Sequence, residues 1–247
     1  MTPSDLLRYR PLLSEASASL THDVSVVDER GRRSVIAIPA ERPLTMYVDK
    51  RELVTLMTLG GAPEALTLGY LRNQRLVKSI EDIKSVQVDW AVDAVAVVTH
   101  KGIADVEERT SKKVVTTGCG QGSVFGGLMD EVDQIALPAD ARLSQSTVYK
   151  IVETIRTQQS IYKQAGSVHG CALFSNTGEL LYFFEDVGRH NAVDAIAGRM
   201  WLDGMRGEDK VFYTTGRLTS EMVIKGAQMG IPFLLSRSGT TQMGHMV

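Results

Sequence analysis

Apolar residues in the first part of the chain occur in short runs rich in valine, leucine and isoleucine, which is typical of β-strands. Residues 24–27 and 35–38 flank a charged turn in which Gly31 can adopt the positive φ that a hairpin needs. Residues 44–48 and 53–58 flank a second charged turn in the same way. The pattern therefore predicts two consecutive β-hairpins.

A helix is expected directly after the second hairpin. Pro63 suits the first helical position, and Glu64 interacts favourably with the positive end of the helix dipole. Leu66, Leu68 and Leu71 then supply an apolar face.

Three other segments complete the first half of the chain. Residues 86–88 and 94–98 are predicted strands, and a short strand at 114–115 leads into a glycine-rich loop. In the first 20 residues, a weak pattern of leucines is interrupted by Pro11 and followed by several serines. This composition predicts a mobile lead-in, that is, a flexible N-terminal segment.

After Pro138 the apolar residues recur with the spacing of an α-helix. Either Ser144 or Ser146 can cap the start of a helix there. One long helix is predicted by the apolar residues that recur every three to four positions, which are Val148, Ile151, Val152, Ile155 and Ile161.

Strands and helices alternate over the last 80 residues. The predicted order is strands at 168–174 and 180–184, a helix at 191–201, a strand at 211–214, a helix at 220–229 and a strand at 231–235. The last strand, helix and strand form a crossover unit in which the two strands are parallel. We therefore expect an α/β fold with a mixed sheet, divided into an N-terminal β-rich subdomain (1–140) and a C-terminal α/β subdomain (141–247).

The composition is that of an ordinary globular protein. Of 247 residues, 43% are hydrophobic, and the net charge of -2 gives no electrostatic reason for binding nucleic acid or a membrane surface. No apolar run reaches the roughly 18 residues that span a bilayer. Because residues 1–20 are polar and lack a signal-peptide core, a cytoplasmic location is expected.

Two cysteines are too few for a disulfide framework or a four-cysteine zinc site. Cys119 lies among the five glycines of "TTGCGQGSVFGG", a density that indicates a loop that moves or allows a close approach to its backbone. Its thiol could be presented to partners. Alternatively, the loop cradles phosphate with an incidental cysteine, or is a surface connection, although the lysine of a P-loop is missing.

Three loops of the second half each follow a strand and combine arginine with glycine and hydroxyl or amide groups. They are Glu185–Asn191, Thr214–Ser220 and Ser236–Thr241. Ligands of α/β sheets bind at the carboxyl ends of strands, where helix N-termini and arginines favour anions. The three loops together predict a phosphate or nucleotide site, if their strands are neighbours.

Two histidines and the second cysteine have competing interpretations. His190 lies inside the first arginine loop and could bind a ligand, whereas a structural role is favoured for His169. Cys171 lies in an apolar strand and is predicted to be packed in the core. A zinc site that combined both cysteines and both histidines would need ligands from distant segments, and no metal is expected.

These segments, in this order, resemble the FdhD/NarQ family, whose members are sulfurtransferases required for formate dehydrogenase activity. The resemblance runs from about Arg42 to Met243 and is carried by "RPLTMYVDKRELVTLMTLG", "GYLRNQRLV", "TTGCGQGSVFG", "EDVGRHNAVDAI" and "TGRLTSEMVIKGAQMGIPFLLSRSGTT". It implies a cytidine deaminase-like fold and a homodimer. It also implies a protein that accepts sulfur from a cysteine desulfurase of the IscS type and passes it to the Mo-bis(molybdopterin guanine dinucleotide) cofactor of formate dehydrogenase.

The resemblance places the sulfur-bearing cysteine of the family on Cys119. A soft thiolate can attack a donor persulfide and later offer the outer sulfur to a soft metal. The pyrophosphates of the cofactor would occupy the arginine loops. The candidate cofactor-binding residues are Arg189, His190, Thr215, Gly216, Arg217, Ser236 and Arg237.

The chain departs from the family pattern in two places. Many members carry a second cysteine three positions after the first, where this chain has Gly122, so a relay between two thiols of this loop has no second partner. Relatives also continue beyond the third arginine loop with a further helix and strand, whereas residues 242–247 resemble the first turns of a helix, and we expect a truncated C-terminal subdomain.

Two other functions are alternatives to sulfur transfer. A zinc deaminase would need His-x-Glu and Pro-Cys-x-x-Cys, but this chain has "HGC" at residues 169–171 and the remainder of neither motif. The other is a non-catalytic chaperone that binds a nucleotide or the molybdenum cofactor, with Cys119 incidental.

Overall fold

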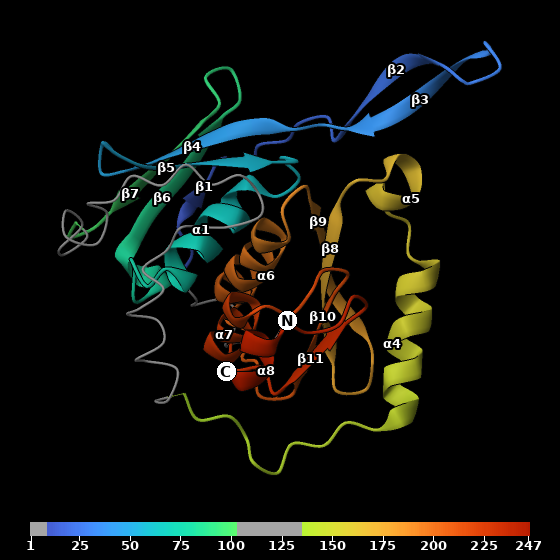
Figure 1. The fold of residues 1–247 in the computed structure, drawn as a ribbon. Helices are drawn as coiled ribbons and strands as arrows, with labels where there is room; N and C mark the ends of the chain where they lie inside the picture. Colours follow the sequence, from blue (N-terminus) through green and yellow to red (C-terminus); the bar gives the residue numbers. More distant parts are fainter. Residues whose placement is uncertain (1–8, 103–134) are drawn as a thin grey trace.

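The computed structural model describes residues 9–102 and 135–247, arranged as two large sheets with the helices α1 and α6 between them and a separate two-stranded ribbon (Figure 1). The first range contains β1 (Leu12–Leu13), β2 (Thr21–Val27), β3 (Arg33–Pro39), β4 (Arg42–Val48), β5 (Arg51–Thr58), α1 (Pro63–Asn73), the 3-10 helix η2 (Ile80–Asp82), β6 (Ile83–Asp89) and β7 (Ala94–Thr99). The second contains α4 (Gln145–Thr157), α5 (Ile161–Ala165), β8 (His169–Ser175), β9 (Leu180–Asp186), α6 (Arg189–Asp203), β10 (Lys210–Thr214), α7 (Ser220–Gln228), β11 (Phe233–Ser236) and α8 (Gln242–Met246).

The N-terminal sheet has five strands in the order β1-β6-β7-β4-β5. Its alternating pattern buries Leu44, Met46 and Val48 of β4 together with Val54 and Leu56 of β5. Both predicted hairpins are confirmed, because β4 pairs with β5 and β2 pairs with β3 in antiparallel register. The β2–β3 hairpin is a separate ribbon that projects from the body of the molecule in Figure 1.

The prediction of a mobile lead-in is wrong for residues 12–13, which form β1. This strand pairs in parallel with β6 and completes one edge of the sheet. Leu13 packs against the core of the N-terminal sheet, and the Tyr9 hydroxyl donates a hydrogen bond to the Ile83 carbonyl at 2.6 Å. The local composition resembles a flexible terminus, but pairing with a strand some 70 residues away satisfies its backbone.

The C-terminal sheet has the strand order β11-β10-β8-β9. β8 is antiparallel to both of its neighbours, and β10 and β11 are parallel, as the strand, helix and strand unit predicts. One face packs against α6 and α7 through a cluster that includes Leu173, Phe212 and Met222. The other face packs against Ile151 of α4. The expected mixed α/β class is confirmed, and the likeness to the cytidine deaminases stays a prediction.

The helices α1 and α6 lie side by side between the two sheets (Figure 1). Both are buried on almost every side, which is typical of a helix at the centre of a protein. Their backbones meet at Gly69 and Gly198. A Cβ atom at Gly69 would lie 1.7 Å from the Asp194 carbonyl oxygen, and one at Gly198 would lie 1.9 Å from that of Ala65. Glycine at these positions therefore sets the distance between the layers.

We expect Gly198→Ala to destabilise the protein by about 3 kcal/mol or more, because an added methyl group would collide with backbone rather than with a movable side chain. Helix propensity alone predicts a gain of roughly 0.5–1 kcal/mol from the same change. Urea unfolding measures the difference. Gly61→Ala is the control, since its Cβ would meet Leu20 at an ordinary 3.6 Å. Equal stabilities of the two variants would contradict the close packing.

The long helix predicted from residue 144 is shorter than expected. Ser144 does cap α4, but the helix ends at Thr157, and Ile161 begins the separate helix α5. Only Ile151 is buried along α4, while Val152 is 51% exposed. The separate start of α5 is stabilised by the Ser160 cap and by a carboxylate of β9 that accepts hydrogen bonds from the first N–H groups of the helix.

Some predictions fall outside this description or are left untested by it. The short strand at 114–115 and the glycine-rich loop with Cys119 lie outside the described residues. The division into subdomains at residue 140 stays a prediction. Within residues 9–102 and 135–247, no helix is both long and apolar enough to cross a membrane.

Candidate functional site

The three arginine loops begin at the same edge of the C-terminal sheet. Because β8 is antiparallel to β9 and to β10, and β10 is parallel to β11, the carboxyl ends of β9, β10 and β11 meet there with the start of β8. β10 and β11 are adjacent, and β9 lies one strand further away. We call this region the arginine edge, after Arg189, Arg217 and Arg237.

Hydrogen bonds join the second and third loops of the arginine edge. The Ser236 hydroxyl donates to the Gly216 carbonyl at 2.7 Å, and the Arg237 N–H donates to the Thr214 carbonyl at 3.1 Å. The Thr215 hydroxyl accepts from the N–H of Gly170 at 3.0 Å, which joins the second loop to β8. Two of the predicted cofactor residues, Thr215 and Ser236, therefore use their hydroxyl groups to build the edge itself.

Arg189 is the first residue of α6 and is only 8% exposed. Its buried Nε has no hydrogen-bond partner within the described structure. A Cβ atom at position 216 would lie 3.0 Å from the Arg189 Cδ, so Gly216 permits the second loop to approach this side chain. The N-cap residue Gly188 offers no side-chain cap, and the first turn carries no acidic residue. A helix N-terminus with an unpaired arginine donor is suited to an anion.

His169 lies at the start of β8 and is affected by the charges of all three arginines. Burial lowers the pKa of this half-buried imidazole, and the positive charges of Arg189, Arg237 and Arg217 lower that pKa further. Arg217 and Arg237 are exposed, and the Arg237 guanidinium lies over the Tyr162 ring at 5.3 Å from its centre. The arginine edge therefore combines three cations from three loops beside an imidazole held in its neutral form.

His190 is placed differently from the arginines. It is 2% exposed, its Nε2 lies 3.5 Å from Glu221 Oε2, and its buried Nδ1 has no hydrogen-bond partner in the described structure. Burial first, and then the charges of Lys225 and Arg189, lower its pKa to about 2. The imidazole is therefore neutral and interior, and a direct contact with a cofactor stays a prediction.

The pKa of His190 predicts a specific dependence of stability on pH. The unfolded chain binds a proton near pH 6.5, but the folded chain does not until about pH 2, so stability is complete above pH 6.5 and falls as the pH decreases. We expect the free energy of unfolding to fall by roughly 2 kcal/mol more in the native chain than in His190→Gln between pH 7 and pH 5. Urea titrations at both pH values test this. Parallel losses in the two proteins would contradict a neutral His190.

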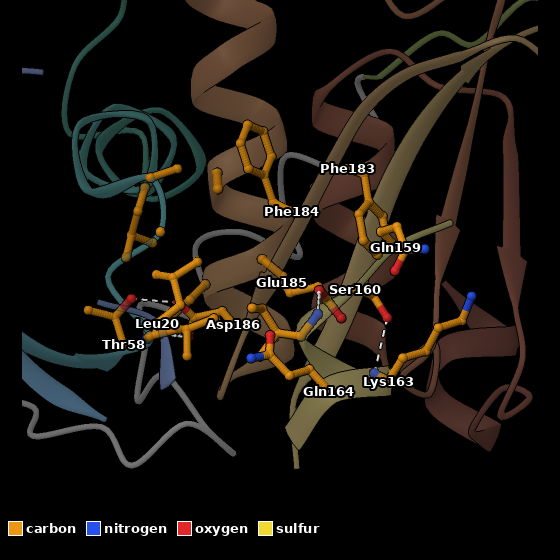
Figure 2. Close-up of a pocket in the computed structure, with 18 residues that line it drawn as sticks. Leu20, Thr58, Gln159, Ser160, Lys163, Gln164, Phe183, Phe184, Glu185 and Asp186 are labelled. Atoms are coloured by element: carbon orange, nitrogen blue, oxygen red, sulfur yellow. Dashed lines mark hydrogen bonds between the residues drawn. The ribbon is translucent and has the colours of Figure 1, made fainter. Parts of the chain in front are cut away.

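A cavity of about 720 Å³ lies between α1, α6, the end of β9 and α5 (Figure 2), and Glu185, Asp186 and Asn191 of the first arginine loop line it. Its apolar wall includes Leu20, Leu66 and Phe184, and Lys163 and Gln164 line the side formed by α5. None of the seven predicted cofactor-binding residues lines it. Volume favours this cavity as a ligand site, but the arginine edge fits an anionic ligand better because it provides the cationic donors.

Comparison with known proteins agrees with this architecture. A model of the FdhD/NarQ family matches residues 39–247. The chain belongs to the FdhD/NarQ family. It is 31% identical to the sulfur carrier protein FdhD of Listeria monocytogenes over 209 residues, which cover 84% of this chain and 80% of that protein. The FdhD of Saccharolobus solfataricus is 30% identical over 226 residues, 89% of this chain and 84% of that protein.

The fold is also similar to a crystal structure from Desulfotalea psychrophila that is described as a formate dehydrogenase accessory protein. The TM-score is 0.70 at 27% identity, and the match covers 91% of this chain and 86% of that one. The recognition of the family from the sequence motifs is therefore confirmed. The particular site residues named from those motifs stay predictions.

The family motif "EDVGRHN" contains structural residues that the sequence analysis did not assign. Asp186 Oδ2 accepts hydrogen bonds from the Thr58 hydroxyl at 2.5 Å and the Leu59 N–H at 3.1 Å, both at the end of β5. Its Oδ1 accepts from the Gly188 N–H at 3.0 Å and from the Asn191 side chain at 2.9 Å. Asp186 thus joins the N-terminal sheet to the start of α6. An aspartate two residues before a glycine is the available signal, because it favours an Asx turn.

Cys171 is confirmed as a core residue of this FdhD/NarQ chain. Its side chain is fully buried on β8, and burial raises the pKa of the thiol to about 12. The thiol donates to the Thr214 hydroxyl at 3.4 Å. Among the described residues, no group of three or more potential metal ligands occurs together. Cys119, the cysteine predicted to be reactive, lies outside that part of the chain.

Proposed function

We propose that this chain is a sulfurtransferase that carries sulfur as a persulfide on Cys119 from a cysteine desulfurase to the Mo-bis(molybdopterin guanine dinucleotide) cofactor, for the activation of formate dehydrogenase. The observation that carries the proposal is that the loops of Arg189, Arg217 and Arg237 follow β9, β10 and β11 at the same end of the C-terminal sheet. The pyrophosphate groups of a dinucleotide cofactor need such cationic donors. Relatives that share the family motifs are named sulfur carrier proteins, which supports the transfer of sulfur.

The proposed chemistry has two steps. First, the Cys119 thiolate attacks the outer sulfur of the desulfurase persulfide, a new S–S bond forms on Cys119, and the desulfurase cysteine leaves as a thiolate. Second, the outer sulfur moves to molybdenum. The S–S bond breaks, Cys119 leaves as a thiolate, and molybdenum loses the two electrons that convert the transferred sulfur to sulfide.

The arginine loops have a binding role in this scheme. Arg189 supplies a donor at the N-terminus of α6, and Arg217 and Arg237 add charge from the neighbouring loops. Phosphate groups pair well with guanidinium groups because the planar guanidinium presents several N–H donors and the phosphate presents several oxygen acceptors. Low pKa values keep His169 and His190 neutral at pH 7, so neither imidazole adds a charge of its own.

A second function is favoured by one observation. The described residues of the arginine edge are suited to binding an anion, and none of them carries a thiol. A chaperone would bind the cofactor through these residues without carrying sulfur. The two functions differ only in what Cys119 does, so the test is made on that thiol. The proposal also includes a cytoplasmic homodimer with formate dehydrogenase as a partner.

The direct test is sulfur loading of the full chain by a cysteine desulfurase and cysteine. After digestion without reductant, mass spectrometry should find one added sulfur atom on the peptide with Cys119, and dithiothreitol should remove it. The peptide with Cys171 is the internal control, because its buried thiol has a pKa of about 12 and should stay unmodified. An unmodified Cys119 peptide would overturn sulfur carriage and leave the chaperone.

A further inference from the structure

Glu185 makes an unusual contact with a helix distant from it in the sequence. It is the penultimate residue of β9, and its side chain reaches the start of α5 (Figure 2). Glu185 Oε2 accepts a hydrogen bond from the Ile161 N–H at 2.6 Å, and Oε1 accepts one from the Tyr162 N–H at 3.1 Å. One carboxylate therefore binds two consecutive N–H groups at a helix N-terminus, where a negative charge is favourable.

This contact helps to position α5, which also lies against β3. The helix has five residues, none of them buried, so it cannot be held by an extended apolar face. Ile161 makes a partly buried contact with a small cluster of Ala40, Leu59 and Val168. The Ser160 hydroxyl accepts from the Lys163 N–H, which stabilises the helix internally but does not attach it to the sheet.

Tyr162 connects α5 to the arginine edge. The Arg237 guanidinium lies over its ring at 5.3 Å from the centre. Arg237 is exposed, and a long exposed side chain samples many rotamers unless a contact restricts it. Stacking on an aromatic ring provides such a restriction for arginine. The positive charge of Arg237 is also one of those that lower the pKa of His169.

We propose that Glu185 is a positioning residue for the anion site. Its carboxylate places the backbone of Tyr162, and the Tyr162 ring places the guanidinium of Arg237 at the arginine edge. The inference rests on the proposed binding of phosphate groups there, but it assigns a role to two residues that do not themselves contact the anion.

The test is a double-mutant cycle read by the affinity of the full chain for GDP, used as a diphosphate probe. Arg237→Gln, Glu185→Ala and Tyr162→Leu should each weaken GDP binding about fivefold, and Tyr162→Phe, which keeps the ring, should bind like the native chain. Glu185→Ala combined with Arg237→Gln should be no weaker than Arg237→Gln alone, because both changes remove the same contact. A purely structural role for Glu185 would not give this non-additivity.

The outcomes separate the two levels of the proposal. Suppose that Arg237→Gln weakens GDP binding. If the fold-losses of Glu185→Ala and Arg237→Gln then multiply in the double variant, or if Tyr162→Leu has no effect, the positioning role is overturned while the anion site stands. If the native chain does not bind GDP, or binds it independently of Arg237, the proposed anion site fails first and the positioning role with it. Tyr162→Leu keeps the cycle informative if Glu185→Ala does not fold, because Glu185 binds only the backbone of Tyr162.

Discussion

Replacement of Cys119 by alanine should abolish the activation of formate dehydrogenase, with a loss of roughly two orders of magnitude or more, because no other group can take over the nucleophile. Cys171 cannot replace it, since that thiol is fully buried and its pKa is raised to about 12. The measurement is formate dehydrogenase activity in cells that lack their own family member and express either the native chain or the variant.

Binding and stability should not change in the same variant. Every described residue of the arginine edge is still present in Cys119→Ala, so its affinity for GDP should stay within about twofold of the native value. Cys171→Ala is the matched control, because it removes the other thiol, and it should still activate the enzyme. Retained activity in Cys119→Ala, with GDP binding intact, would support the chaperone and rule out the persulfide.

Replacement of Lys225 by methionine should lower the free energy of unfolding by about 3–5 kcal/mol, because it would leave Asp194 as a buried carboxylate without its cation. Lys225 Nζ lies 2.9 Å from the Asp194 carboxylate and 3.7 Å from Glu221, and both Lys225 and Asp194 are almost inaccessible to water. Asn73 donates to Asp194 at 2.7 Å. The network joins α1, α6 and α7, and urea unfolding measures its loss.

Two variants make the Lys225 prediction specific. Lys150→Met is the same change on an exposed position of α4 and should cost less than about 1 kcal/mol. Lys225→Met combined with Asp194→Asn removes both charges, so it should be more stable than the sum of the two single losses predicts. A Lys225→Met variant as stable as Lys150→Met would show that the ion pair does not hold the helices together.

The elements that the sequence predicted correctly are those with a local cause. The alternation around Gly31 and the pairs of runs at 44–48 and 53–58 specify hairpins, because neighbouring segments pair with one another. Pro63 begins α1 and Ser144 caps α4, since both effects act within one helical turn. The errors concern long-range contacts. β1 pairs with the edge strand β6, and Glu185 binds the first N–H groups of α5, which is a helix separate from α4.

The candidate site divides in the same way. Arginine, glycine and hydroxyl residues after three strands indicated an anion site, and the strand directions do bring those loops to one edge. The contacts that each of these side chains makes could not be inferred from the same residue types. His190 and Arg189 are adjacent in the motif and both are buried, yet His190 Nε2 lies 3.5 Å from Glu221 while the Arg189 side chain lies against Gly216. These different contacts depend on residues from other elements of the fold.

The sequence by itself determined the family, the α/β class and the nucleophile candidate Cys119, because motifs and periodicity are carried by residues close together in the chain. Only the tertiary structure decided that Gly69 and Gly198 set the spacing of the central helices, that Thr215 and Ser236 hold the loops, and that Arg237 lies on Tyr162. Each of these depends on atoms that approach within a few ångströms from distant segments. Local sequence preferences cannot specify these contacts, because close packing depends on side chains that come from many parts of the chain.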